Sequence, residues 1–221
     1  MARTHLCCLS CLLATVLAFP YPSFAFDTPL SDTAVREAYF LGQHRDESLA
    51  RFLEKYSIHL PVPKTGPHIA SLTFFTPYAQ AVQLSSTSPP GYSAQQAQID
   101  HRKHAETVKL IVQIWLTQSY GPFLSLPTGT SSNSPTGIAL RPYDFWKDFD
   151  VQVFSNDKLL RPFSSAGQPT YSCDDGGCVL SGATLEFEFL ASTLSPDSTT
   201  VQIDPPEGDQ LVVDFNLASV R

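Results

Sequence analysis

Apolar and polar residues alternate along several segments of the chain, most clearly in its second half. Alternation with a period of two directs apolar side chains to one face of a strand and polar ones to the other. We therefore expect strands at residues 69–75, 108–116, 150–154, 158–163, 185–189, 201–203 and 211–217, and on both flanks of a turn at 174–177. Turn residues separate the later segments at short intervals. The pattern predicts a mainly β protein, a two-layer antiparallel β-sandwich of immunoglobulin-like architecture.

A helical period replaces this alternation between residues 31 and 56. Apolar residues recur there at spacings of three and four, which places them on one face of a helix. Gly42 and the polar residues after it interrupt the pattern, so we expect two short helices, an N-terminal helical hairpin. The Gln- and Ala-rich segment 93–106 predicts one further helix, and residues 85–91 are expected to form a loop.

These elements predict three regions. Residues 1–25 are predicted to be a signal peptide, residues 26–67 carry the helical hairpin packed on the sheet, and residues 68–221 form the β-sandwich domain. A Pro-, Gly- and Ser-rich stretch at about residues 118–142 is expected to be a long exposed loop of that domain or a linker. One sandwich is favoured over two domains, because residues 26–117 alone would supply a meagre core.

The first 25 residues have the pattern of a secretory signal peptide. Arg3 supplies one positive charge, residues 6–19 are apolar, and the small residues Ser23 and Ala25 fit cleavage near Ala25. The apolar run is shorter than a membrane-spanning helix requires, and Cys11 fits a lipoprotein cleavage site poorly. We expect a bacterial protein that is periplasmic or secreted after cleavage, with no membrane span in its mature chain.

Two cysteines remain after cleavage, Cys173 and Cys178, on either side of an Asp-Asp-Gly-Gly turn. Such a turn folds its flanks back on each other, so the cysteines should meet and form a disulfide in an oxidising compartment. For so short a loop the bond stabilises the fold by about 2 kcal/mol. A redox dithiol or half of a metal site are the alternatives, but four intervening residues on a turn suit neither.

The composition excludes several other classes of protein. With 43% apolar and 16% charged residues the 221-residue chain is globular rather than disordered. Its formal net charge of −7 argues against a nucleic-acid-binding surface, which needs clustered Lys and Arg.

The densest cluster of ionisable residues contains His101, His104 and Glu106. On a helix the two histidines, three residues apart, would share a face and could bind zinc or another divalent metal. Arg102 and Lys103 place cations beside this position, so a solvated helix is the favoured interpretation. The acidic turns 174–177 and 207–209 could supply calcium ligands, although neither matches the alternating-Asp loop. We therefore expect no cofactor, with zinc and calcium as the alternatives.

Other catalytic signals in the sequence are weak. There is no Gly-x-Ser-x-Gly elbow and no Gly-rich phosphate loop. Glu186 and Glu188 fall on one face of a strand at a separation that suits glycoside hydrolysis, but alternating glutamates are typical of a solvent-exposed face.

Aromatic residues offer a further candidate site. Tyr143 and Trp146 lie close together in sequence, and exposed rings of this kind can form a platform for a sugar or a peptide. The sequence predicts an exported, non-enzymatic interaction or structural module of a bacterial envelope, whose partner is an envelope protein or a glycan. A metal-dependent hydrolase using His101 and His104, or a carbohydrate- or peptide-binding module, are the alternatives.

Overall fold

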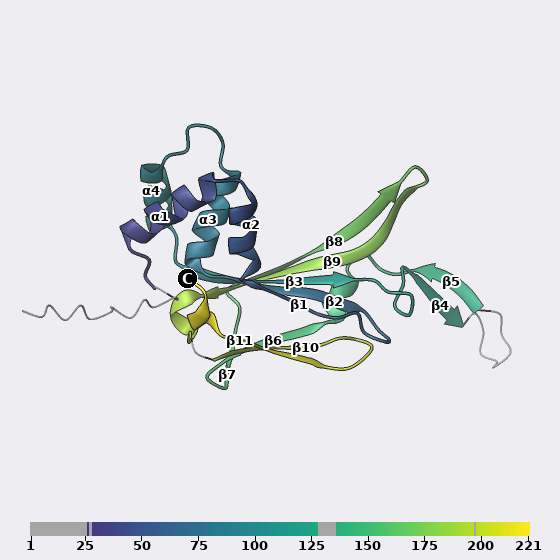
Figure 1. The fold of residues 1–221 in the computed structure, drawn as a ribbon. Helices are drawn as coiled ribbons and strands as arrows, with labels where there is room; N and C mark the ends of the chain where they lie inside the picture. The colour runs from purple at the N-terminus through teal and green to yellow at the C-terminus, as the bar shows by residue number, and fades with distance from the viewer. Residues whose placement is uncertain (1–25, 27, 128–135, 197) are drawn as a thin grey trace, which may run out of the picture.

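The computed structural model describes residues 26, 28–127, 136–196 and 198–221. The protein is mainly β, with antiparallel sheets and four α-helices (Figure 1). One sheet has five strands, in the order β1 (Ser57–His59), β2 (His68–Phe75), β3 (Thr107–Trp115), β9 (Gly177–Leu190) and β8 (Ser164–Asp174). A second sheet has four, in the order β11 (Leu211–Phe215), β10 (Thr199–Asp204), β6 (Asp150–Ser155) and β7 (Lys158–Leu160). The remaining two strands, β4 (Phe123–Pro127) and β5 (Thr136–Leu140), pair only with each other.

The two larger sheets share one hydrophobic core. Alternate residues of β3 are fully buried in it, as the period of two predicts. Residues of the four-stranded sheet join the same cluster, and the rings of Phe74 and Phe215 meet edge to face with centroids 4.8 Å apart. Each fully buried aliphatic or aromatic side chain stabilises the fold by about 1.5–3 kcal/mol. The early strands β2 and β3 join the late strand β9 in one sheet, because β3 pairs with β9 along its whole length.

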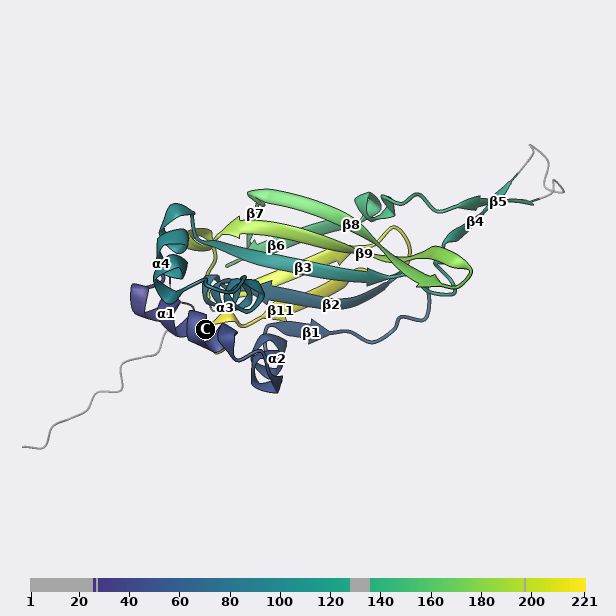
Figure 2. The ribbon, with the colours of Figure 1, turned by 90° about the horizontal axis from the view of Figure 1, so that it is seen from above.

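The four helices are α1 (Asp32–Gln43), α2 (Glu47–Glu54), α3 (Pro77–Thr87) and α4 (Ala94–Lys103). They gather at one end of the five-stranded sheet, where all four contribute to a second small core (Figures 1 and 2). Each begins at a residue whose side chain accepts a backbone N–H of the first turn. The caps are Ser31, Asp46, Thr76 and Ser93.

The two short helices predicted for residues 31–56 are present as α1 and α2, but Gly42, expected in the break between them, lies inside α1. A Cβ atom there would lie 2.3 Å from the carbonyl oxygen of Val82 in α3. Glycine is therefore needed for the close approach of the two helices, and α1 ends one residue later.

The helix predicted at residues 93–106 is present as α4, but the expectation that it is the one further helix is wrong, because α3 also follows the hairpin. Residues 85–87, expected in a loop, complete α3. The helix begins with Thr76 as its cap and Pro77 at its first position, a combination that favours helix initiation.

The strands differ from their prediction in several places. The second flank of the cysteine turn and residues 185–189 were expected as separate strands, but β9 runs through both. The last strand ends at Phe215, and Leu217 lies in a short 3₁₀ turn. Within residues 118–142, expected as loop or linker, the structure contains the β4–β5 hairpin.

None of the helices in the described part of the chain has the length and hydropathy that a bilayer crossing requires.

Candidate functional site

The β4–β5 hairpin projects from the end of the molecule opposite the helices, and we call it the arm (Figures 1 and 2). Its register places Phe123 opposite Leu140 and Ser125 opposite Ile138. Residues directly opposite each other, and those two positions along, share one face of an antiparallel pair. Phe123, Ile138 and Leu140 therefore lie on one face, and they are 60%, 80% and 73% exposed. We call these three side chains the apolar face of the arm.

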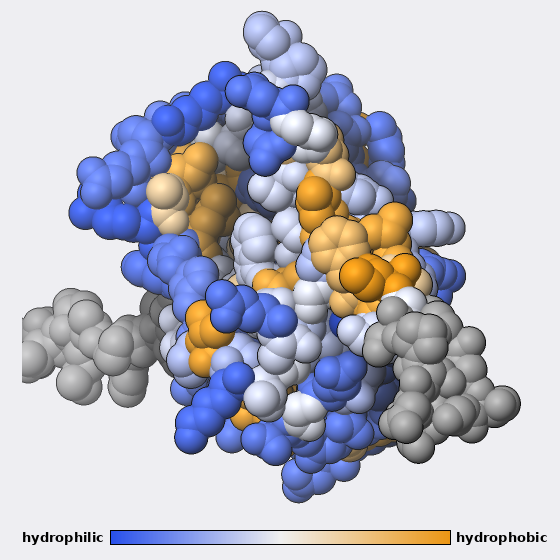
Figure 3. All heavy atoms as spheres, turned by 90° about the vertical axis from the view of Figure 1, so that its right-hand side faces the viewer, coloured by the Kyte–Doolittle hydropathy of each residue, from blue (hydrophilic) through white to orange (hydrophobic). Residues whose placement is uncertain are grey.

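The arm differs from the rest of the surface in its charge. Residues 110–140 contain no Asp, Glu, Lys, Arg or His, although the whole chain has a net charge of −7. Proteins commonly protect exposed strands with charged side chains, and the arm has none. Apolar residues gather on this side of the molecule (Figure 3). The arm is thus an uncharged, apolar projection of an acidic protein.

The base of the arm is fixed to the body of the protein by Arg141. Its backbone N–H donates to the carbonyl of Pro122 across the hairpin, and its Nε donates to the carbonyl of Gly121 at 2.8 Å. The guanidinium lies 3.4 Å from the ring centroid of Tyr120, a residue buried in the main core. Cation–π contacts of this kind stabilise by about 0.5–2 kcal/mol.

The two aromatic residues predicted as a ligand platform lie just beyond the arm. Tyr143 is exposed, and its ring meets that of Trp146 edge to face at 6.4 Å. Trp146 is half-buried and packs on the main core, over Gly167 of β8. A Cβ at position 167 would lie 2.0 Å from the indole Nε1, so the ring covers the space that a side chain would occupy. Of the pair, only Tyr143 presents an open ring.

The histidine cluster is arranged differently from its prediction. Helix α4 ends at Lys103, and His104 is its C-cap with extended backbone, so the two histidines do not share a helix face. Instead, Nε2 of His101 lies 2.8 Å from Oε1 of Glu106. The same Oε1 accepts the backbone N–H of Leu30 at 2.6 Å, and Oε2 is buried with no hydrogen-bond partner among the described residues.

His101, His104 and Glu106 lie where two cavities adjoin. One cavity, of about 750 Å³, is also lined by apolar residues that include Leu30 and Leu190. The other, of about 640 Å³, lies between α3, α4 and the start of β3. In the part of the chain that the structure describes, no three His, Cys, Asp or Glu residues come together as a metal site would require. The structure thus joins His101 to Glu106 but does not assemble the predicted set of ligands.

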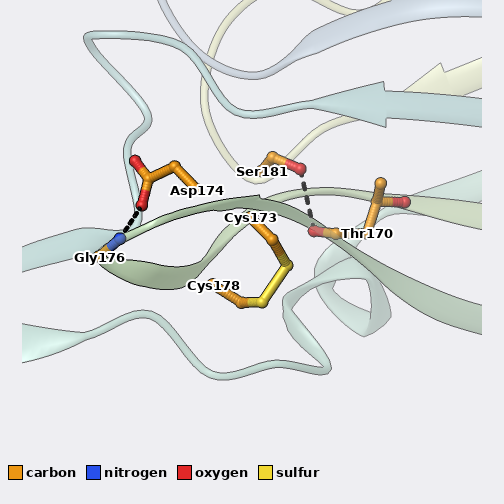
Figure 4. The surroundings of a disulfide bond; sticks show 6 residues. All are labelled: Thr170, Cys173, Asp174, Gly176, Cys178 and Ser181. Carbon is orange, nitrogen blue, oxygen red and sulfur yellow. Dashed lines mark hydrogen bonds between the residues drawn. A yellow bond between two sulfur atoms is a disulfide. The ribbon is translucent and has the colours of Figure 1, made fainter.

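The predicted disulfide is confirmed. Cys173 and Cys178 lie directly opposite each other in β8 and β9 and are joined at the tip of this hairpin (Figure 4). Asp174 Oδ1 accepts the N–H of Gly176 at 2.8 Å, and Gly177 has a φ of 127°, which favours glycine. The bond links neighbouring strands at an exposed tip and makes no link between the two sheets.

The two glutamates of β9 form ion pairs with Lys109. The Lys109 ammonium lies 2.6 Å from Oε1 of Glu186 and 3.5 Å from Oε1 of Glu188. Burial lowers the pKa of Lys109, but the two carboxylates outweigh that effect and raise it. This ion-pair network on the outer face of the sheet accounts for both carboxylates.

A scan of known protein families finds no model that matches the chain, and a search of curated proteins finds no significant relative. The arm was missed by the sequence-based interpretation, which noted the Pro, Gly and Ser content of the stretch. Two short apolar segments at 123–127 and 136–140, with no charge in or between them, were the signal that could have found it.

Proposed function

We propose that the chain is an exported protein of a bacterial envelope that works as a non-enzymatic interaction module, and that the apolar face of the arm is its contact surface. The observation that carries this proposal is the exposure of Phe123, Ile138 and Leu140 on a hairpin without charges. The largest exposed apolar patch of a monomeric protein is often a functional site.

Export is supported by the pattern of residues 1–25 and by the disulfide, a bond that persists in oxidising compartments. Mass spectrometry of the protein from a bacterial envelope fraction tests it. We expect a chain that begins at Phe26 and carries both cysteines oxidised. A full-length chain in the cytosol with two free thiols would contradict export.

A protein surface fits the arm better than the other partners considered. Two of the three side chains of the apolar face, Ile138 and Leu140, are aliphatic and offer a sugar no flat ring to stack on, and Phe123 supplies a single ring, so a protein partner is favoured over a glycan. A nucleic acid would need positive charges that the arm lacks. Tyr143, which follows Arg141 and Pro142 at the base of the arm, is also exposed.

Photo-cross-linking in cells tests the contact surface. A photoreactive residue at position 138 should give a discrete cross-linked product, whereas one at Val62, an apolar residue that is 70% exposed elsewhere on the protein, should not. Comparable or absent cross-linking from both positions would overturn the proposal.

A metal-dependent hydrolase is the second candidate. The contact between His101 and Glu106 at the meeting point of two cavities favours it. Metal analysis of the purified protein, with a His101→Ala, His104→Ala double variant as the control, separates the two functions. A stoichiometric transition metal that is lost in the double variant would overturn the non-enzymatic proposal.

For the fold, we propose that the two larger sheets form an immunoglobulin-like sandwich. The core residues that both sheets contribute support this arrangement, as do the antiparallel pairings throughout.

A further inference from the structure

We infer that the partner of the arm is a second copy of this chain, and that two arms pack with their apolar faces together about a two-fold axis. This inference rests on the proposed function, because it names the partner of the same surface. A two-fold interface brings one patch against itself, so the patch must be self-complementary. An uncharged apolar face meets that condition, because it carries no charges or polar groups that would need complementary partners on the second copy.

The distribution of charge selects the arm as the place where two copies can meet. With a net charge of −7, two copies of the chain repel each other overall. The arm carries no charge and projects away from the body, so its contact brings few like charges close (Figures 1 and 2). Repulsion between the bodies thus disfavours other modes of self-association more than it disfavours this one.

The stability of the arm points the same way. An isolated two-stranded hairpin is at best marginally stable in water, and a packed apolar face is what it lacks. Arg141 fixes the base, but nothing in the described part of the chain covers Phe123, Ile138 and Leu140 farther out. Two arms packed face to face would form a small two-layer core of six apolar side chains.

The size of the contact predicts a weak dimer. From their exposed fractions, the three residues expose about 400 Å² per arm, so a symmetric pair buries at most about 800 Å² in total, below the range of stable interfaces. We therefore expect association that depends strongly on concentration, with monomers and dimers in rapid exchange.

A lipid surface is the main alternative for an exposed apolar hairpin. The arm carries no positive charge that would attract it to anionic lipid headgroups, and the net charge of the whole chain is −7. Lipid insertion is therefore disfavoured, and sedimentation with phosphatidylcholine vesicles is included in the test as the competing outcome.

Sedimentation velocity of the purified protein over a hundredfold concentration range tests the inference. We expect the wild type to shift from monomer towards dimer, and an Ile138→Ser, Leu140→Ser double variant to remain a monomer. A Val62→Ser, Phe163→Ser double variant is the matched control, since both positions are apolar and about 70% exposed, and it should dimerise like the wild type. Far-UV circular dichroism checks that all three proteins are folded.

Charge substitutions at position 138 give a second readout. Ile138→Glu and Ile138→Lys should each prevent association alone, because like charges would meet across the axis, and an equimolar mixture should recover dimers. A wild type that stays monomeric, an arm variant that still dimerises, a mixture that stays monomeric, or binding to the vesicles would each overturn the inference.

Failure of this inference can be told apart from failure of the proposed function. A cross-linked product from position 138 with twice the mass of the chain supports a second copy. A product of any other mass overturns the second copy but leaves the arm as a contact surface. No product at all overturns both.

Discussion

Replacing Gly167 by alanine tests whether Trp146 is a packing residue rather than a ligand platform. The added Cβ would lie 2.0 Å from the indole Nε1 and 2.5 Å from Cδ1, whereas ordinary contacts are 3.4–4 Å, so the ring must move by more than 1 Å. Overpacking of this size costs about 1–3 kcal/mol. The gain from replacing glycine within a strand, about 0.5–1 kcal/mol, acts in the opposite direction. We therefore expect Gly167→Ala to lower the free energy of unfolding by about 1–2 kcal/mol.

Urea unfolding followed by tryptophan fluorescence measures this change. The displaced indole should also become more accessible to acrylamide quenching in the folded variant. Gly121→Ala is the control, because its Cβ would meet only the Thr117 carbonyl at an ordinary 3.5 Å, and it should change the stability little. Equal stability and equal quenching for Gly167→Ala and wild type would refute the packing role of Trp146.

Three further predictions concern other parts of the fold. Arg221→Ala removes an ion pair with Glu37 at 2.7 Å and a cation–π contact with Tyr78 at 4.6 Å, so thermal unfolding should show that the free energy of unfolding falls by about 1 kcal/mol. The control is Arg51→Ala, which breaks only an exposed ion pair with Glu47 at 4.0 Å and should change the free energy of unfolding very little. Burial raises the pKa of Tyr56 to about 12 against opposing hydrogen bonds, so its contribution to stability is complete below pH 10 and is lost as the pH rises towards 12. Denaturant titrations at each pH should show a shallower decline for Tyr56→Phe, and an identical decline would count against this assignment. Alanine at both disulfide positions should cost no more than about 2 kcal/mol, because the tip of β8 and β9 is exposed; a variant that failed to fold would show a larger role.

The sequence predicted the elements whose apolar period is strong. The alternation in residues 108–116 matches β3, because every second side chain there enters the shared core. The cysteine turn was equally predictable, since its residues require a tight turn whatever the rest of the chain does.

Tertiary contacts explain the elements that were missed. Helix α3 has a weakly amphipathic sequence and owes its burial to α1 and α4, so its start at Thr76 and Pro77 was its only local signal. Gly42 resembles a helix breaker in sequence, yet the approach of α3 requires it. The two histidines do not share a helix face because α4 ends before His104, and the hydrophobic pattern of the sequence does not indicate this helix end.

Radical footprinting of aromatic side chains in living cells tests the central claim most directly, which is that the arm is covered by a partner. Phe123 on the arm and Phe163 on the body are 60% and 71% exposed in the isolated chain, so both should oxidise readily in dilute purified protein. In cells we predict that oxidation of Phe123 falls several-fold relative to Phe163. An unchanged ratio of the two residues between cells and dilute solution would contradict the account.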